Sequence, residues 1–196
     1  MDTVVRISVY LVAAMVIFVI GSSILDLTAA RKEEASSRQP EKDHGKKVLK
    51  FTEKHRKSIK AWILFATVFL IFYETIFFRP VTYRRYVFTP FYSYRLAMLG
   101  NTYYLREGLL NIFLYVPFGF MLRANFKKAG LWRILLIGCA LSFLIETLQL
   151  IFCIGVFETD DIINNTLGAL IGGACHLLGE NIKHRILGQN AQKKQN

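Results

Sequence analysis

The stretch Leu131–Ile154, LWRILLIGCALSFLIETLQLIFCI, decides the fold of this chain. A helix rises about 1.5 Å per residue, so roughly 20 apolar residues cross a hydrocarbon core about 30 Å thick. Leu131–Ile154 exceeds this length, and we therefore predict a transmembrane helix here. The chain as a whole is 53% hydrophobic with a mean hydropathy of +0.33, which is too apolar for an ordinary soluble domain.

Four further apolar runs accompany this stretch. Those that reach the length of a span are Val4–Leu27, Ile59–Phe78 and Ile162–Leu178. Leu109–Leu122 is shorter and holds Asn111 and Pro117, so it is either a full span or a re-entrant segment; we expect a span, because Tyr103–Leu105 can extend it. We expect the first run to be retained rather than cleaved as a signal peptide. The sequence therefore predicts an all-α fold, a polytopic transmembrane helical bundle of about five spans in the cell membrane.

Lysines and arginines in the connections predict the orientation, because their transfer across the membrane is disfavoured. They are frequent between the first and second runs, between the third and fourth, and after the fifth. These segments are expected in the cytoplasm, which places the N-terminus outside and the C-terminus in the cytoplasm. The connection between the second and third runs then lies outside, although it carries Arg79, Arg84, Arg85, Arg95 and Arg106. Its many tyrosines suggest a segment in the headgroup layer.

The same features divide the chain into three parts. Residues 1–58 are expected to form an N-terminal transmembrane helix followed by a basic cytoplasmic linker. Residues 59–182 form a transmembrane helical domain, and residues 183–196 a disordered basic tail.

The net charge of +11 does not indicate nucleic acid as a partner, because the basic residues flank apolar runs. We expect them to orient the protein and to contact membrane lipids. The three cysteines lie in or at the end of apolar runs and are interpreted as small apolar side chains. The four histidines are far apart, so we expect no metal site and no cofactor.

Polar side chains inside the apolar runs indicate a site, because an unpaired polar group in lipid is costly. Ser142, Glu146 and Gln149 share one helix face by their spacing, and Asp161, Asn164 and Asn165 form a second polar stripe. Gly168 and Gly172 continue that second stripe as a GxxxG pattern, which lets another helix approach closely. The short turn between these two runs makes the helices antiparallel neighbours. Asp160 is interpreted as a solvated turn residue.

We expect these stripes to form an outward-opening polar cup, which Asn111 and nearby arginines join. The predicted ligand-binding residues are Asn111, Ser142, Glu146, Gln149, Asp161, Asn164, Asn165, Arg95 and Arg106. A purely structural interpretation stays open, in which Glu146 is the buried partner of Arg95 or Arg106 and the amides bond neighbouring helices.

Three motifs in order resemble the VanZ-like family. They are NIFLYVPFGF from Asn111 to Phe120, SFLIETLQL from Ser142 to Leu150 and DDIINNTLGALIGG from Asp160 to Gly173, preceded by TPF at Thr89 to Phe91. The resemblance covers about the second half of the chain. It implies a bacterial envelope protein whose best-known relatives are linked to reduced susceptibility to teicoplanin and related lipoglycopeptides.

Two main functions remain open. The first is a non-enzymatic resistance factor whose cup binds a lipoglycopeptide antibiotic, an anionic envelope polymer or a lipid-linked precursor. The alternative is an enzyme acting on a lipid-linked envelope substrate, with Glu146 as general base and Asn111, Asn164 or Asn165 stabilising developing charge. A small-solute carrier is a third interpretation, disfavoured by the apolar inner halves of the spans. The oligomeric state is open, a homo-oligomer included.

Overall fold

The computed structural model describes residues 43–77 and 79–192, with side chains within 55–77 and 79–185. The described part is almost entirely helical. Its elements are α2 (Asp43–Phe72), a π-helical turn η1 (Tyr73–Phe77), β1 (Arg85–Val87), α3 (Tyr92–Met98), α4 (Thr102–Asn125), α5 (Leu131–Phe152), β2 (Val156–Glu158) and α6 (Thr159–Gln192).

The predicted all-α transmembrane bundle is confirmed. Four helical segments of the described part are long and apolar enough to cross a membrane: His55–Phe77, Thr102–Asn125, Leu131–Phe152 and Thr159–Arg185. The run Leu109–Leu122 is part of the continuous helix α4, which begins at Thr102 and contains Pro117. The expected first span, Val4–Leu27, lies outside the described residues.

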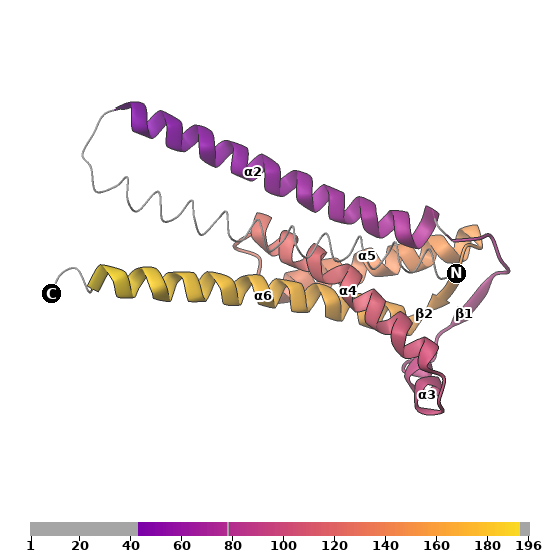
Figure 1. The fold of residues 1–196 in the computed structure, drawn as a ribbon. Coiled ribbons are helices and arrows are strands. Elements are labelled where there is room, and N and C mark those ends of the chain that lie inside the picture. Colours follow the sequence, from indigo (N-terminus) through magenta and orange to yellow (C-terminus); the bar gives the residue numbers. More distant parts are fainter. Residues whose placement is uncertain (1–42, 78, 193–196) are drawn as a thin grey trace.

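The helices form one bundle, in which α4 contacts α2, α5 and α6 (Figure 1). Its centre is apolar and comes from all four long helices. The buried core residues are Ile71, Leu114, Tyr115, Phe118, Leu122, Ile134, Ile145 and Ala169. Because lipid also solvates apolar side chains, close packing between the helices, rather than removal from water, holds this core together.

Helices α4 and α6 approach so closely that their backbones touch. A Cβ atom added at Gly168 would collide with the carbonyl oxygen of Ile112, and one at Gly172 with that of Val116. The contact is reciprocal, because a Cβ atom at Gly119 on α4 would collide with the carbonyl of Ala169 on α6. The close approach predicted from the GxxxG pattern is therefore confirmed.

The connection between η1 and α4 folds over one end of the bundle. Its strand β1 pairs in parallel with β2, with Arg85 opposite Val156 and Val87 opposite Glu158. We call this the pocket end: η1 and α5 end there, α4 and α6 begin there, and β1, β2 and α3 cover it (Figure 1).

Helix α6 continues to Gln192, into the segment 183–196 that the sequence predicted as a disordered tail. Likewise, α2 begins at Asp43, inside the expected linker of residues 1–58. Both extensions follow from cooperative helix formation, because each residue added to an existing helix costs far less than starting a new one.

The glycine contact predicts a position-specific effect of alanine in α6. Gly172→Ala should destabilise the protein by about 1–3 kcal/mol, because the methyl group forces the two backbones apart. The matched control is Gly179→Ala, since nothing lies within 4 Å of a Cβ atom there and alanine favours the helix. Thermal unfolding of the purified protein in detergent measures both. Equal unfolding midpoints for the two variants would contradict the backbone contact.

Candidate functional site

Asp160 joins the beginning of α6 to the beginning of α3. It is 2% exposed, and its two carboxylate oxygens accept hydrogen bonds from the backbone N–H groups of Phe91 (2.5 Å) and Ser93 (2.8 Å). Phe91 has a φ of 62°, a left-handed conformation that is uncommon for an aromatic residue. The interpretation of Asp160 as a solvated turn residue is therefore wrong. Its carboxylate holds α3 against the bundle.

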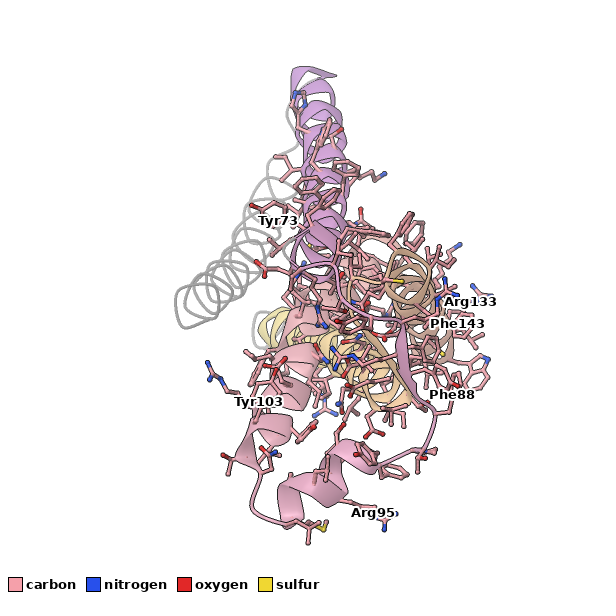
Figure 2. The ribbon with its side chains drawn as sticks, turned by 90° about the vertical axis from the view of Figure 1, so that its right-hand side faces the viewer. Tyr73, Phe88, Arg95, Tyr103, Arg133 and Phe143 are labelled. Atoms are coloured by element: carbon pink, nitrogen blue, oxygen red, sulfur yellow. The ribbon has the colours of Figure 1, made fainter. Side chains whose placement is uncertain are left out.

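Further hydrogen bonds fix the connection to the turn between α5 and α6. The backbone N–H of Thr82 donates to the carbonyl of Cys153 at 2.6 Å, and the Thr159 hydroxyl donates to the carbonyl of Phe88 at 3.3 Å. The ring of Phe157 packs between Phe88 and Phe143, at centroid distances of 5.3 and 6.1 Å. Phe88 and Phe143 lie on the same side of the pocket end (Figure 2).

Four of the predicted site residues are buried and form hydrogen bonds that join one element to another. The Glu146 carboxylate accepts from the backbone N–H of Glu158 at 3.0 Å and is 2% exposed. The amide of Asn165 donates to the Ser142 hydroxyl at 2.8 Å, linking α6 to α5. The Gln149 side chain donates to the carbonyl of Thr75 at 2.9 Å, linking α5 to η1.

A pocket of about 270 Å³ opens at the pocket end, beside these buried residues. Its lining combines both signs of charge with aromatic rings. The lining residues are Arg79, Arg85, Ser93, Tyr94, Tyr103, Tyr104, Glu107, Gly108, Val156, Glu158, Asp161 and Asn164. They come from the connection, α3, α4, β2 and α6, so the pocket exists only when these elements are docked together.

Hydrogen bonds orient several groups in the pocket wall. The Tyr94 hydroxyl donates to the side-chain oxygen of Asn164, and the Ser93 hydroxyl donates to Glu158 at 3.2 Å. Asn111 does not line the pocket, but it lies on α4 near Asp161 of α6.

Burial and neighbouring charges shift the ionisation of the pocket wall. Burial raises the pKa of Glu158, and the nearby carboxylates of Asp160 and Glu107 raise it further. The Ser93 hydrogen bond and Arg79 lower the same pKa, so Arg79 lies close enough to act on this wall. The pKa of Tyr94 is also raised, by burial and then by Asp160.

The structure brings together some of the predicted site residues and separates others. Asp161 and Asn164 line the pocket, whereas Arg95 and Arg106 are exposed and do not. Arg95 lies on α3 at the periphery and points away from the bundle (Figure 2). Neither arginine bonds to Glu146, whose carboxylate partner is the Glu158 backbone.

Sequence reasoning missed the two arginines that do line the pocket, Arg79 and Arg85. Arg79 directly follows the end of the second apolar run, and Arg85 lies in β1. No local sequence pattern marks Arg85, because the pairing of residues 85–87 with 156–158 joins three-residue segments about 70 positions apart in the chain. In the described part of the chain, no group of three or more His, Cys, Asp or Glu side chains is arranged to hold a metal ion.

Comparison with known proteins gives one family. The model of the VanZ/LLP1 family matches residues 8–179. Protein VanZ of Enterococcus faecium is 37% identical over 79 residues, which cover 40% of this chain and 48% of that protein. The aligned part thus spans about half the length of this relative. No solved structure matches the chain significantly.

Loss of the Asp160 carboxylate should release α3. Asp160→Ala leaves two backbone N–H groups unpaired, and hydrogen bonds to charged groups contribute about 1.5–3 kcal/mol each. Amide hydrogen exchange in residues 91–96 should therefore accelerate roughly tenfold or more. Asp160→Asn keeps one side-chain acceptor and should give an intermediate rate. Asp161→Ala is the control, and an equal acceleration in this variant would show that Asp160 has no special role.

Proposed function

Because the chain belongs to the VanZ/LLP1 family, we propose that it lowers the susceptibility of a bacterial cell to teicoplanin-type lipoglycopeptides. It acts from the cell membrane by binding one polar group of the antibiotic, of a lipid or of an envelope polymer. The binding site is the pocket. The similarity to Protein VanZ supports the resistance role, and the geometry of the pocket supports binding as the mechanism.

The distribution of charge supports an outward-facing pocket. The end of the bundle opposite the pocket carries the basic loop between α4 and α5, with Lys127 and Lys128, and the basic end of α6, with Lys183 and Arg185. Basic connections are retained in the cytoplasm. The pocket end then faces the outside, where envelope polymers and glycopeptides occur.

The observation that carries the proposal is the unpaired charge in the pocket wall. Within the described residues, neither Arg79 nor Arg85 forms an ion pair with a carboxylate. Arginine forks bind phosphate and carboxylate groups well, and unpaired ones near a polar cavity are available for a ligand. A pocket of about 270 Å³ is at the small end of ligand sites, so it takes one group rather than a whole antibiotic.

The enzymatic alternative with Glu146 as general base has less support. A general base has to reach the proton that it removes, directly or through one water. Glu146 is buried behind β2 and does not line the pocket. Its carboxylate is used in holding the turn between α5 and α6, and we therefore favour binding over catalysis.

Susceptibility testing of a bacterial host distinguishes these ideas. Wild type should raise the inhibitory concentration of teicoplanin but not that of vancomycin. Arg79→Gln and Asp161→Asn should abolish protection, because loss of a charged contact weakens binding roughly tenfold or more. Arg95→Gln is the matched control, since Arg95 is exposed away from the pocket, and it should protect like wild type.

Membrane levels of all variants have to match for this comparison. Glu146→Gln keeps an acceptor for the Glu158 N–H and should keep protection. Loss of protection in this variant at normal stability would favour the enzyme. Equal protection by Arg79→Gln, Arg95→Gln and wild type would exclude the pocket as the site.

A further inference from the structure

The pocket holds opposite charges that do not neutralise one another by direct contact. Arg79 and Arg85 face it together with Glu107, Glu158 and Asp161. Among the described residues, no ion pair within 4.0 Å joins these arginines to these carboxylates. The opposite end of the bundle differs, because Glu180 pairs there with Arg123 at 3.5 Å and with Lys127 at 3.4 Å.

We propose that the pocket binds a zwitterionic group, a primary ammonium joined by a short spacer to a phosphodiester. The inference rests on the proposed function, in that it takes the pocket as the binding site, and it names the chemistry of the group bound. A phospholipid headgroup and a free or polymer-borne aminoalkyl phosphate share this chemistry.

The two arginines account for the phosphodiester. A guanidinium presents several N–H donors in a plane, which matches two phosphate oxygens at once. Arg79 lies close enough to Glu158 to lower the pKa of that carboxyl group, so a phosphate bound to Arg79 lies near the carboxylates too. A simple phosphate would satisfy the arginines but would leave Glu107, Glu158 and Asp161 without a cationic partner in the same cavity.

The three carboxylates account for the ammonium. An ammonium group placed among Glu107, Glu158 and Asp161 is attracted by their carboxylates, whereas an amine without a phosphate would leave both arginines without an anionic partner. The rings of Tyr94, Tyr103 and Tyr104 add aromatic surface for cation–π contacts to the pocket lining. Only a group that carries both charges interacts favourably with both kinds of charged side chain in the lining.

Hydrogen bonding selects a primary ammonium over a quaternary one. The wall offers carboxylate oxygens, and a primary ammonium has three N–H donors for them. A trimethylammonium group has none and is bulkier. The small cavity of about 270 Å³ favours the smaller group for the same reason.

Binding to the purified full chain in detergent tests the inference, with four soluble probes compared by calorimetry. Glycerophosphoethanolamine should bind, whereas glycerol 3-phosphate, ethanolamine and glycerophosphocholine should bind at least roughly tenfold more weakly. Arg85→Gln and Asp161→Asn should each weaken binding of glycerophosphoethanolamine roughly tenfold. Arg95→Gln should leave it unchanged. Because Arg85 is exposed, Arg85→Gln should not affect folding, and it tests the contact between an arginine and the phosphodiester.

Any other order of affinity among the four probes overturns the inference. Equal binding of glycerol 3-phosphate indicates a simple anion site, equal binding of ethanolamine a cation site, and equal binding of glycerophosphocholine a site without N–H recognition. A second arm uses nanodiscs of phosphatidylethanolamine against phosphatidylglycerol. Competition of the soluble probe only by the first lipid identifies a lipid headgroup as the source, and competition by neither identifies a free or polymer-borne group. Absence of binding to any probe in detergent overturns the inference.

The outcome is separable from that of the proposed function. Headgroup binding without any change in antibiotic susceptibility would leave this inference standing and refute the resistance role. Antibiotic protection that depends on Arg79, without binding of glycerophosphoethanolamine, would refute only the zwitterionic ligand.

Discussion

The contact between the backbones of α4 and α6 determines where the polar groups of this protein lie. Gly168 and Gly172 leave no side chain between α6 and the carbonyl groups of α4, and Gly119 does the same in the reverse direction. One helical turn beyond this contact, a Cβ atom at Gly108 would lie 3.0 Å from the Asn164 amide. Glu107 on α4 and Asp161 on α6, which both line the pocket, lie near this point. A larger side chain at the contact would separate the two walls of the pocket.

Polar residues on the spans have two roles that sequence alone does not separate. Ser142, Glu146 and Asn165 hold α5, α6 and β2 together by internal hydrogen bonds. Asp161 and Asn164, on the same helix as Asn165, instead line the pocket. The side chains of the two groups leave the helix in different directions, because successive residues are about 100° apart around its axis. Interhelical hydrogen bonds in membranes contribute on average only about 0.6 kcal/mol, so burial of a polar group does not by itself show a binding role.

The helices were predictable from the sequence. The cover of the pocket, which consists of β1, β2 and α3, was not. Long apolar runs, the shared face of Ser142 and Glu146 and the GxxxG pattern depend on local periodicity, and each is present in the structure. The cover depends on pairing between distant segments of three residues, too short for a strand pattern, and on a left-handed Phe91 that no glycine marks. Arg79 and Arg85 were therefore missed as site residues, while Arg95 and Arg106 were predicted although neither lines the pocket.

The two ends of the bundle differ more clearly in their ion pairs than in their amino-acid composition. At the end opposite the pocket, Glu180 lies within 4.0 Å of Arg123, Lys127 and His176, so its charge is satisfied within the protein. At the pocket end, Arg79 and Arg85 face a cavity with Glu107, Glu158 and Asp161, and among the described residues no ion pair within 4.0 Å joins these arginines to these carboxylates. Charges that are satisfied internally hold helices together and gain little from a further ion. Charges that face a cavity without an ion-pair partner are stabilised by a ligand group of opposite charge, and for this reason we propose the pocket end as the site of recognition.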